Sequence, residues 1–197
     1  MHTAPVRMAI FASGGGSNAR NLLNHFQGSD LAEVCLMVSN NSQSGIFQFG
    51  PDFQVPTMLL TRSEYSSGTH LRDLMQAHQV DLIILAGYLK LIPAELVAAF
   101  PDTIINIHPA LLPRYGGKGM YGMNVHKAVI QQGEAWSGIT IHRVNEEYDK
   151  GAMLFQHGFP VEADWAPEDL AKRIQKAEHR FFPQVVESVC KTLNSQD

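Results

Sequence analysis

A near-continuous apolar run at residues 81–87, DLIILAG, constrains the fold more than any other segment. A strand that carries apolar side chains on both faces is typical of a parallel sheet covered by helices on both sides. The other elements expected in this half of the chain are strands at 8–13, 32–39 and 59–61 and helices at 18–26, from 71 and at 93–100. This β-α-β-α order predicts an α/β fold, with a Rossmann-like, mostly parallel sheet and right-handed crossovers.

The sequence pattern changes after residue 127. Residues 137–144, SGITIHRV, alternate strictly, and residues 151–161 form another expected strand after a short loop. Two strands this close in sequence predict an antiparallel pair added to the parallel sheet. Residues 166–182 have the spacing of an amphipathic helix, which Pro183 is expected to kink or end.

Length and composition place the whole chain, residues 1–197, in one domain with a proper core. Hydrophobic residues make up 45% of the chain, and the formal net charge is −4. The negative balance argues against nucleic-acid and membrane-surface partners. No apolar segment has the length of a signal peptide or a membrane span, and Cys35 and Cys190 form no CxxC or Cys/His cluster. We therefore expect a soluble protein in a reducing, cytoplasmic compartment.

The stretch SGGGSN at residues 13–18 joins the first expected strand to the first helix. Three consecutive glycines allow a tight turn that exposes backbone N–H groups at a helix N-terminus, where a phosphate binds favourably. A simpler role is capping of the helix by Ser17 or Asn18. The turn also fits the G-x-G-x-x-A pattern of a dinucleotide site, but the second strand ends in VSNNSQSG, without the acid that would hold the ribose. A phosphate-binding turn is favoured over a dinucleotide site.

The run TIINIHP at residues 103–109 ends an expected strand with an amide and an imidazole two residues apart. Residues i and i+2 of a strand share a face, so Asn106 and His108 stand side by side at the carboxyl end, where open α/β sheets bind ligands. The pair is either a hydrogen-bonded structural fixture or part of an active site. The chain has no G-x-S-x-G nucleophile motif and no HExxH or other metal spacing among its nine histidines. An amide donor beside an imidazole suits oxyanion stabilisation and proton transfer during acyl transfer.

A histidine in that role needs an acid to orient it. The loop NEEYDKG offers Glu146, Glu147 and Asp149 immediately after the alternating strand, and Gly151 allows a tight turn there. Residue types alone leave open which of the three acids faces the histidine, and a solvated acidic loop is an equal alternative.

Five motifs together carry a resemblance to a known family: FASGGGSN, LAGYLKLIP, INIHPALLPRY, SGITIHRVNEEYDKGAMLFQ and IQKAEHRFFP. From about residue 7 to residue 190 the chain resembles the phosphoribosylglycinamide formyltransferases of the folate-dependent formyltransferase superfamily. The resemblance implies the formyltransferase fold. It also implies direct transfer of the formyl group of 10-formyltetrahydrofolate to the amine of glycinamide ribonucleotide in purine biosynthesis, with no covalent intermediate and no metal.

The resemblance also implies roles for particular residues. The catalytic residues of the family fall on Asn106, His108 and Asp149, and a carboxylate at Asp149 is expected to favour the imidazolium form of His108. The ribonucleotide-binding residues fall on Gly16, Ser17, Asn18, Gln175 and Glu178, and the folate-binding residues on Leu89, Lys90, Leu91 and Ile92 together with Asn106.

Two parts of the sequence depart from the family pattern. Residues 116–129, GGKGMYGMNVHKAV, are longer and richer in glycine than expected, which is either ordinary loop variation or a way for Lys118 to reach the substrate phosphate. Arg62 is a candidate to hold the folate tail, but the local spacing leaves this open. A monomer and a homodimer are both compatible with the sequence.

Other functions compete with this interpretation. A methionyl-tRNA formyltransferase shares the N-x-H element, but we expect it to carry a further C-terminal domain and a positive charge for tRNA. A formyltetrahydrofolate hydrolase is expected to place a regulatory domain before the first strand, and sugar-amine formyltransferases match SGGGSN poorly. A catalytically silent α/β module that binds a nucleotide at the glycine turn would show no dependence on His108.

Overall fold

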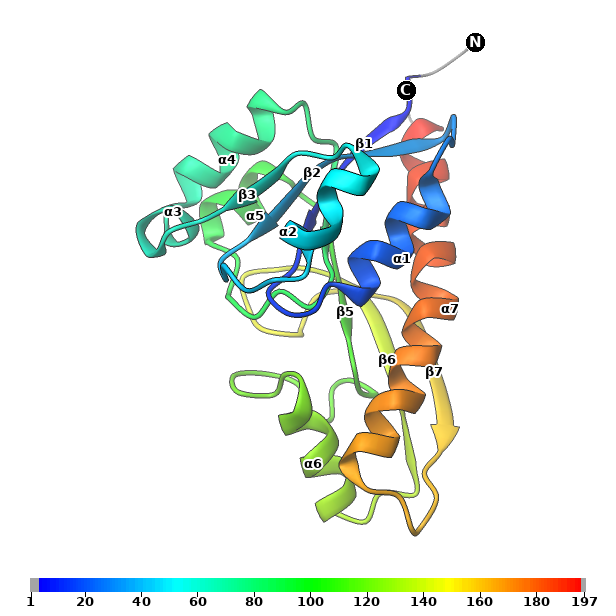
Figure 1. Ribbon diagram of the computed structural model, residues 1–197. Helices are drawn as coiled ribbons and strands as arrows, with labels where there is room; N and C mark the ends of the chain where they lie inside the picture. The colour runs from blue at the N-terminus through cyan, green and yellow to red at the C-terminus, as the bar shows by residue number, and fades with distance from the viewer. Residues whose placement is uncertain (1–3, 196–197) are drawn as a thin grey trace.

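Helices lie on both faces of a seven-stranded sheet in the computed structural model, which describes residues 4–195 (Figure 1). The strands are β1 (Val6–Phe11), β2 (Ala32–Ser39), β3 (Thr57–Leu59), β4 (Leu82–Leu85), β5 (Ile104–His108), β6 (Trp136–Arg143) and β7 (Met153–Pro160). The helices are α1 (Ser17–Phe26), α2 (Ile46–Phe49), the 3-10 turn η1 (Gly50–Phe53), α3 (Arg62–Ser66), α4 (Gly68–Ala77), α5 (Ala94–Ala99), α6 (Met123–Gln131) and α7 (Pro167–Asn194).

The strand order is β3-β2-β1-β4-β5-β6-β7. The first five strands in this order pair in parallel, whereas β6 runs antiparallel to both β5 and β7. The predicted mostly parallel sheet with an added antiparallel pair is therefore confirmed. Among the described residues, no helix combines the length and the apolar character needed to cross a bilayer.

Alternate residues of the central strands enter two separate cores, one on each face of the sheet. Met8 and Ile10 of β1 pack in the core that includes α1, α6 and α7, and Ala9 and Phe11 pack in the core that includes α4 and α5. The four residues of β4 are all buried, in agreement with the apolar run from which the fold was predicted. Burial on both faces fixes the register of the central strands.

The final helix differs from its prediction because α7 continues through Pro183 to Asn194. Proline lacks the N–H that would bond to the carbonyl of residue i−4, which here is His179. Asn21 of α1 supplies the missing donor: its Nδ2 lies 2.8 Å from the His179 carbonyl oxygen. Pro183 itself is buried, next in sequence to Phe182 of the core. A tertiary hydrogen bond thus allows the helix to continue where the local sequence predicts a kink or an end.

The topology reverses direction between β1 and β4. β1 pairs with β2 on one side and with β4 on the other, so the connections leaving β1 and β4 diverge at their carboxyl ends. Open α/β sheets bind ligands in the crevice that such a switch point creates. The glycine turn follows β1, the segment 87–92 follows β4, and His108 ends β5, so three predicted site segments meet at this edge.

Candidate active site

A cavity of about 760 Å³ opens at the carboxyl ends of β1, β4 and β5. It is lined by the glycine turn at 14–18, by 85–92, by 106–109, by the loop 117–122, by parts of 142–149 and by one face of α7 between 171 and 178. The twelve residues predicted from the sequence to be catalytic or binding all line this one cavity. Pockets of this size, with apolar walls and a few polar groups, are typical of small-molecule sites.

Asn106, His108 and Asp149 converge at the centre of the cavity although they lie on β5 and in the loop after β6. Asp149 Oδ1 lies 3.5 Å from His108 Nδ1 and 3.5 Å from Asn106 Nδ2. The structure therefore places an amide, an imidazole and a carboxylate around one point.

The other two acids of the loop after β6 do not face His108. Glu147 Oε2 lies 2.5 Å from Lys150 Nζ at the surface, and Glu146 is exposed. Asp149 turns inward with a left-handed backbone (φ 56°), and its Oδ2 accepts the Gly117 N–H at 2.9 Å. Burial by itself raises the pKa of Asp149, but the imidazoles of His142 and His108 and the Gly117 N–H outweigh it and lower the pKa below its usual value.

Burial and the Asp149 carboxylate act on the pKa of His108 in opposite directions. Burial lowers the pKa of His108 below its usual value, and the opposing influence of Asp149 only reduces that shift. The imidazole is 3% exposed, and its Nε2 lies 2.7 Å from the Tyr115 carbonyl oxygen, which can only accept. In its neutral form the ring carries its proton on Nε2 and has a lone pair on Nδ1 facing Asp149.

Two functional candidates on β6 were missed in the sequence. The register pairs His142 with Asn106 and Thr140 with His108, so the two side chains share the sheet face of Asn106 and His108, and His142 lines the cavity. Thr140 Oγ1 donates to the Ala110 carbonyl at 2.7 Å and accepts the Leu112 N–H at 3.0 Å, which fixes the chain just after His108. The alternation of SGITIHRV carried this signal, because its polar residues at 140 and 142 share one face.

The glycine turn and α7 are joined by two side-chain hydrogen bonds. Gln175 Nε2 donates to Ser17 Oγ at 3.1 Å, and Asn18 Nδ2 donates to Glu178 Oε2 at 2.9 Å. Neither Ser17 nor Asn18 caps α1, because Gly16 occupies the cap position with φ 74° and no side chain bonds to the exposed N–H groups. The capping alternative is therefore wrong, and the first N–H groups of α1 remain available to an anion.

Glu178 is a second partly buried acid of the site. Burial raises the pKa of Glu178 to about 7, against the opposing effect of the Asn18 hydrogen bond. A carboxyl group that titrates near neutral pH inside a cavity is well suited to bind an amine or to exchange a proton with it.

The segment after β4 forms another wall of the cavity. Leu89 and Leu91 are 42% and 43% exposed, an unusual degree for large apolar residues, and Ile92 is buried beneath them. The Leu89 N–H donates to Ser13 Oγ at 3.1 Å, which ties this wall to the glycine turn.

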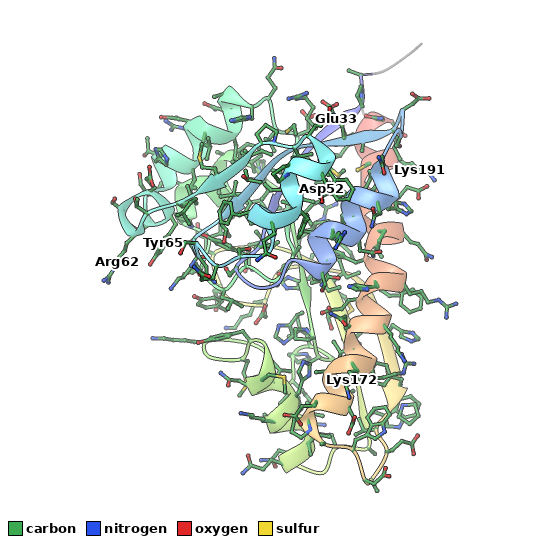
Figure 2. The ribbon with its side chains drawn as sticks, in the orientation of Figure 1. Glu33, Asp52, Arg62, Tyr65, Lys172 and Lys191 are labelled. Carbon is green, nitrogen blue, oxygen red and sulfur yellow. The ribbon has the colours of Figure 1, made fainter. Side chains whose placement is uncertain are left out.

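Two cations near this segment differ in their surroundings. Lys90 Nζ lies 5.3 Å from the centre of the Tyr65 ring on α3. Arg62, the candidate to hold the folate tail, projects outward from α3 at the edge of the molecule (Figure 2).

The glycine-rich loop that departs from the family pattern lies over the cavity. Gly117, Gly119 and Gly122 have positive φ angles, and Lys118 is among the residues that line the cavity. Gly116 packs so closely on Leu112 that an added Cβ would lie 2.6 Å from Leu112 Cδ2.

Within residues 4–195, no group of three or more His, Cys, Asp or Glu residues is arranged to hold a metal ion.

An open α/β sheet that presents an amide, an imidazole and a carboxylate at its switch point has the groups that stabilise an oxyanion and move a proton in group transfer. The family model described as formyl transferase matches residues 6–186, and the chain belongs to this formyl transferase family.

Individual relatives carry more specific names. A chloroplastic phosphoribosylglycinamide formyltransferase of Arabidopsis thaliana is 45% identical over 190 residues, which cover 93% of this chain and 65% of that protein. A second, of Vigna unguiculata, is 44% identical over 189 residues, which cover 93% of this chain and 61% of that protein. The chain thus spans less than two thirds of the length of both plant relatives. The crystal structure of phosphoribosylglycinamide formyltransferase from Anaplasma phagocytophilum superposes with a TM-score of 0.86 at 30% identity, covering 95% of this chain and 87% of that one.

Proposed function

We propose that this chain transfers the formyl group of 10-formyltetrahydrofolate to the amine of 5'-phosphoribosylglycinamide, a step of de novo purine biosynthesis. The products are the N-formyl ribonucleotide and tetrahydrofolate. Family membership and the names of the relatives support this reaction. The observation that carries it is the convergence of Asn106, His108 and Asp149 between an anion-binding turn and an apolar wall, in one cavity.

Asn106 is the oxyanion donor of the proposed mechanism. The substrate amine attacks the formyl carbon, a new C–N bond forms, and the carbonyl oxygen becomes negatively charged. Asn106 Nδ2 carries two N–H groups, and its 3.5 Å approach to Asp149 is long enough that the formyl oxygen can replace the carboxylate as partner. The folate N10–carbon bond then breaks as the carbonyl re-forms.

His108 moves the proton that this reaction releases. The attacking amine becomes an ammonium in the tetrahedral adduct, and the Nδ1 lone pair of neutral His108 accepts its proton. The imidazolium that forms is stabilised by Asp149 at 3.5 Å and by the Tyr115 carbonyl at 2.7 Å. The same proton then passes to the departing folate nitrogen, so the enzyme regains its initial state.

The two substrates approach from opposite walls. The phosphate binds at the free N–H groups of the turn that includes Gly16, Ser17 and Asn18, while Gln175 and Glu178 hold the ribonucleotide from α7, with the amine at Glu178. The pterin of the folate packs on Leu89, Lys90, Leu91 and Ile92 and reaches Asn106 with its formyl group. Holding both reactants in one cavity supplies the advantage of orientation.

Replacing Glu178 by Gln is expected to raise the KM for the ribonucleotide at least about tenfold, because a hydrogen bond to a charged amine is lost. The KM for the folate should change little. Steady-state kinetics with each substrate varied in turn measures both values. Glu187→Gln is the matched control, since Glu187 lies on α7 paired with Lys191 and His25 outside the cavity. An equal rise in both KM values would contradict the assignment of Glu178 to the ribonucleotide.

Replacing Asp149 by Asn is expected to lower the pKa of His108 further, because the carboxylate is the group that opposes the effect of burial. The imidazole then stays neutral to a lower pH than in the parent protein. An NMR titration of the His108 ring protons measures this directly, whereas a kinetic pH profile would also contain Glu178, whose pKa is about 7. An unchanged or raised His108 pKa in the variant would show that Asp149 does not act on this ring.

An assay with pure substrates tests the proposed function. The parent protein should convert 10-formyltetrahydrofolate to tetrahydrofolate only when glycinamide ribonucleotide is present, with one formylated ribonucleotide for each folate consumed. Folate consumption without the amine would instead indicate a hydrolase, and transfer to methionyl-tRNA would indicate the tRNA-dependent relative. Binding of the ribonucleotide with no turnover would indicate a silent binding module. Four further points remain predictions: the use of small molecules alone, the absence of nucleic-acid and membrane partners, a monomer or homodimer, and a cytoplasmic location.

A further inference from the structure

His142 is a buried polar residue of the cavity to which the proposed mechanism gives no role. It lies on β6 directly across from Asn106 in the strand register, and it is 2% exposed. Its side chain contacts three groups: the Arg143 carbonyl oxygen at 2.7 Å from Nδ1, and Asn106 Nδ2 at 3.1 Å and Asp149 Oδ1 at 3.6 Å from Nε2.

These contacts determine which ring nitrogen of His142 carries the proton. A carbonyl oxygen can only accept, so Nδ1 must be the N–H that donates to Arg143. In the neutral imidazole the Nε2 atom then has a lone pair and acts as an acceptor. Its neighbour at hydrogen-bonding distance is the Asn106 amide nitrogen, which can only donate, whereas Asp149 Oδ1 is beyond that distance.

We infer that His142 is a positioning residue that fixes the orientation of the Asn106 amide by accepting one of its two N–H groups at Nε2. Rotating the amide by half a turn would place its carbonyl oxygen against two acceptors, the His142 lone pair and Asp149 Oδ1. In the observed orientation the second N–H points toward Asp149 and becomes the donor for the developing oxyanion. This inference rests on the proposed function for its kinetic consequence, but not for the hydrogen-bond chain itself.

Four substitutions separate this role from simple packing. His142→Phe keeps the bulk of the ring but removes the acceptor. His142→Gln places a carbonyl oxygen near the former Nε2, whereas His142→Asn reaches only the former Nδ1. Asn106→Ala removes the group through which His142 is inferred to act. The control is His157→Phe on β7. His157 lies outside the cavity, and the centres of the His157 and Phe181 rings are 4.5 Å apart.

The expected result for His142→Phe is a kcat reduced about 10- to 100-fold, part of the effect of a single oxyanion donor, with both KM values within about twofold of the parent. His142→Gln should recover most of that loss and His142→Asn should not, and His157→Phe should turn over like the parent. In the Asn106→Ala background, His142→Phe should cause no further loss. An equal loss in both backgrounds, or equal activity of the Gln and Asn variants, would overturn the inference. The Gln and Asn pair decides the question if the Phe variant does not fold.

A spectroscopic measurement tests the hydrogen-bond chain without turnover. In protein labelled with ¹⁵N-histidine, the resonances of the neutral His142 ring should show the tautomer with a protonated Nδ1 and an unprotonated Nε2. A proton on Nε2 would overturn the inference. If the parent transfers no formyl group to the ribonucleotide, the proposed function fails while this measurement still decides the orientation of the amide.

Discussion

His108→Ala is expected to reduce kcat by about 10²- to 10⁴-fold, the range typical of a lost general acid–base group. Without the imidazole, the group proposed to take the ammonium proton from the tetrahedral adduct and return it to the folate nitrogen is missing. The glycine turn and the wall at 89–92 do not contact the removed ring through any hydrogen bond of the structure, so both KM values should change little. Single-turnover kinetics, followed by the absorbance change of the folate, measures the chemical step.

Loss of folding would give the same result for a different reason. His108 is buried and its Nε2 donates to the Tyr115 carbonyl, so the variant also loses a contact to the loop that covers the cavity. Thermal unfolding and ligand-binding titrations with each substrate therefore accompany the kinetics. Parent-like turnover of a folded variant would show that another group carries the proton.

Asn106→Ala is expected to reduce kcat by about 10²- to 10³-fold, because one preorganised donor to the oxyanion is removed. The residue lies on a strand held by β4 and β6 on both sides, so the backbone should not move. Asn106→Asp is the informative companion, since it keeps the shape but replaces the donor by a second carboxylate beside Asp149. We expect the Asp variant to be at least as slow as the Ala variant.

The measurement is again kcat under saturating concentrations of both substrates, with KM values determined in parallel. A loss that appears only in KM would mean that Asn106 binds substrate equally in the ground state and the transition state. Rates within a few-fold of the parent for both variants would place the oxyanion at another donor.

The sheet was predictable because the burial of a strand determines the pattern of apolar residues in its sequence. The continuous apolar run became β4 with all four residues buried, and the strict alternation at 137–144 became β6 of the antiparallel pair. Pro183 shows the limit of local patterns, because the donor that compensates for it comes from Asn21, more than a hundred residues earlier in the chain. No pattern of neighbouring residues in the sequence predicts that contact.

The site was predictable in its members but not in its electrostatics. Asn106 and His108 followed from strand geometry, while the choice of Asp149 came from the family resemblance. Asp149 raises the pKa of His108, as expected, but burial of the ring lowers that pKa by more, and the depth of burial is not evident from the sequence. His142 was missed because its importance arises from register across two strands, and register is fixed by the packed sheet.

The most direct test of the account is a crystal structure of the protein with glycinamide ribonucleotide and a folate analogue that cannot transfer its formyl group. We expect the analogue's carbonyl oxygen to lie within hydrogen-bonding distance of Asn106 Nδ2 and the amine to lie between Glu178 and the formyl carbon. The phosphate should lie at the N–H groups of residues 16–18. A formyl group bound outside the space enclosed by the side chains at 106, 108 and 149, with both ligands fully occupied, would contradict it.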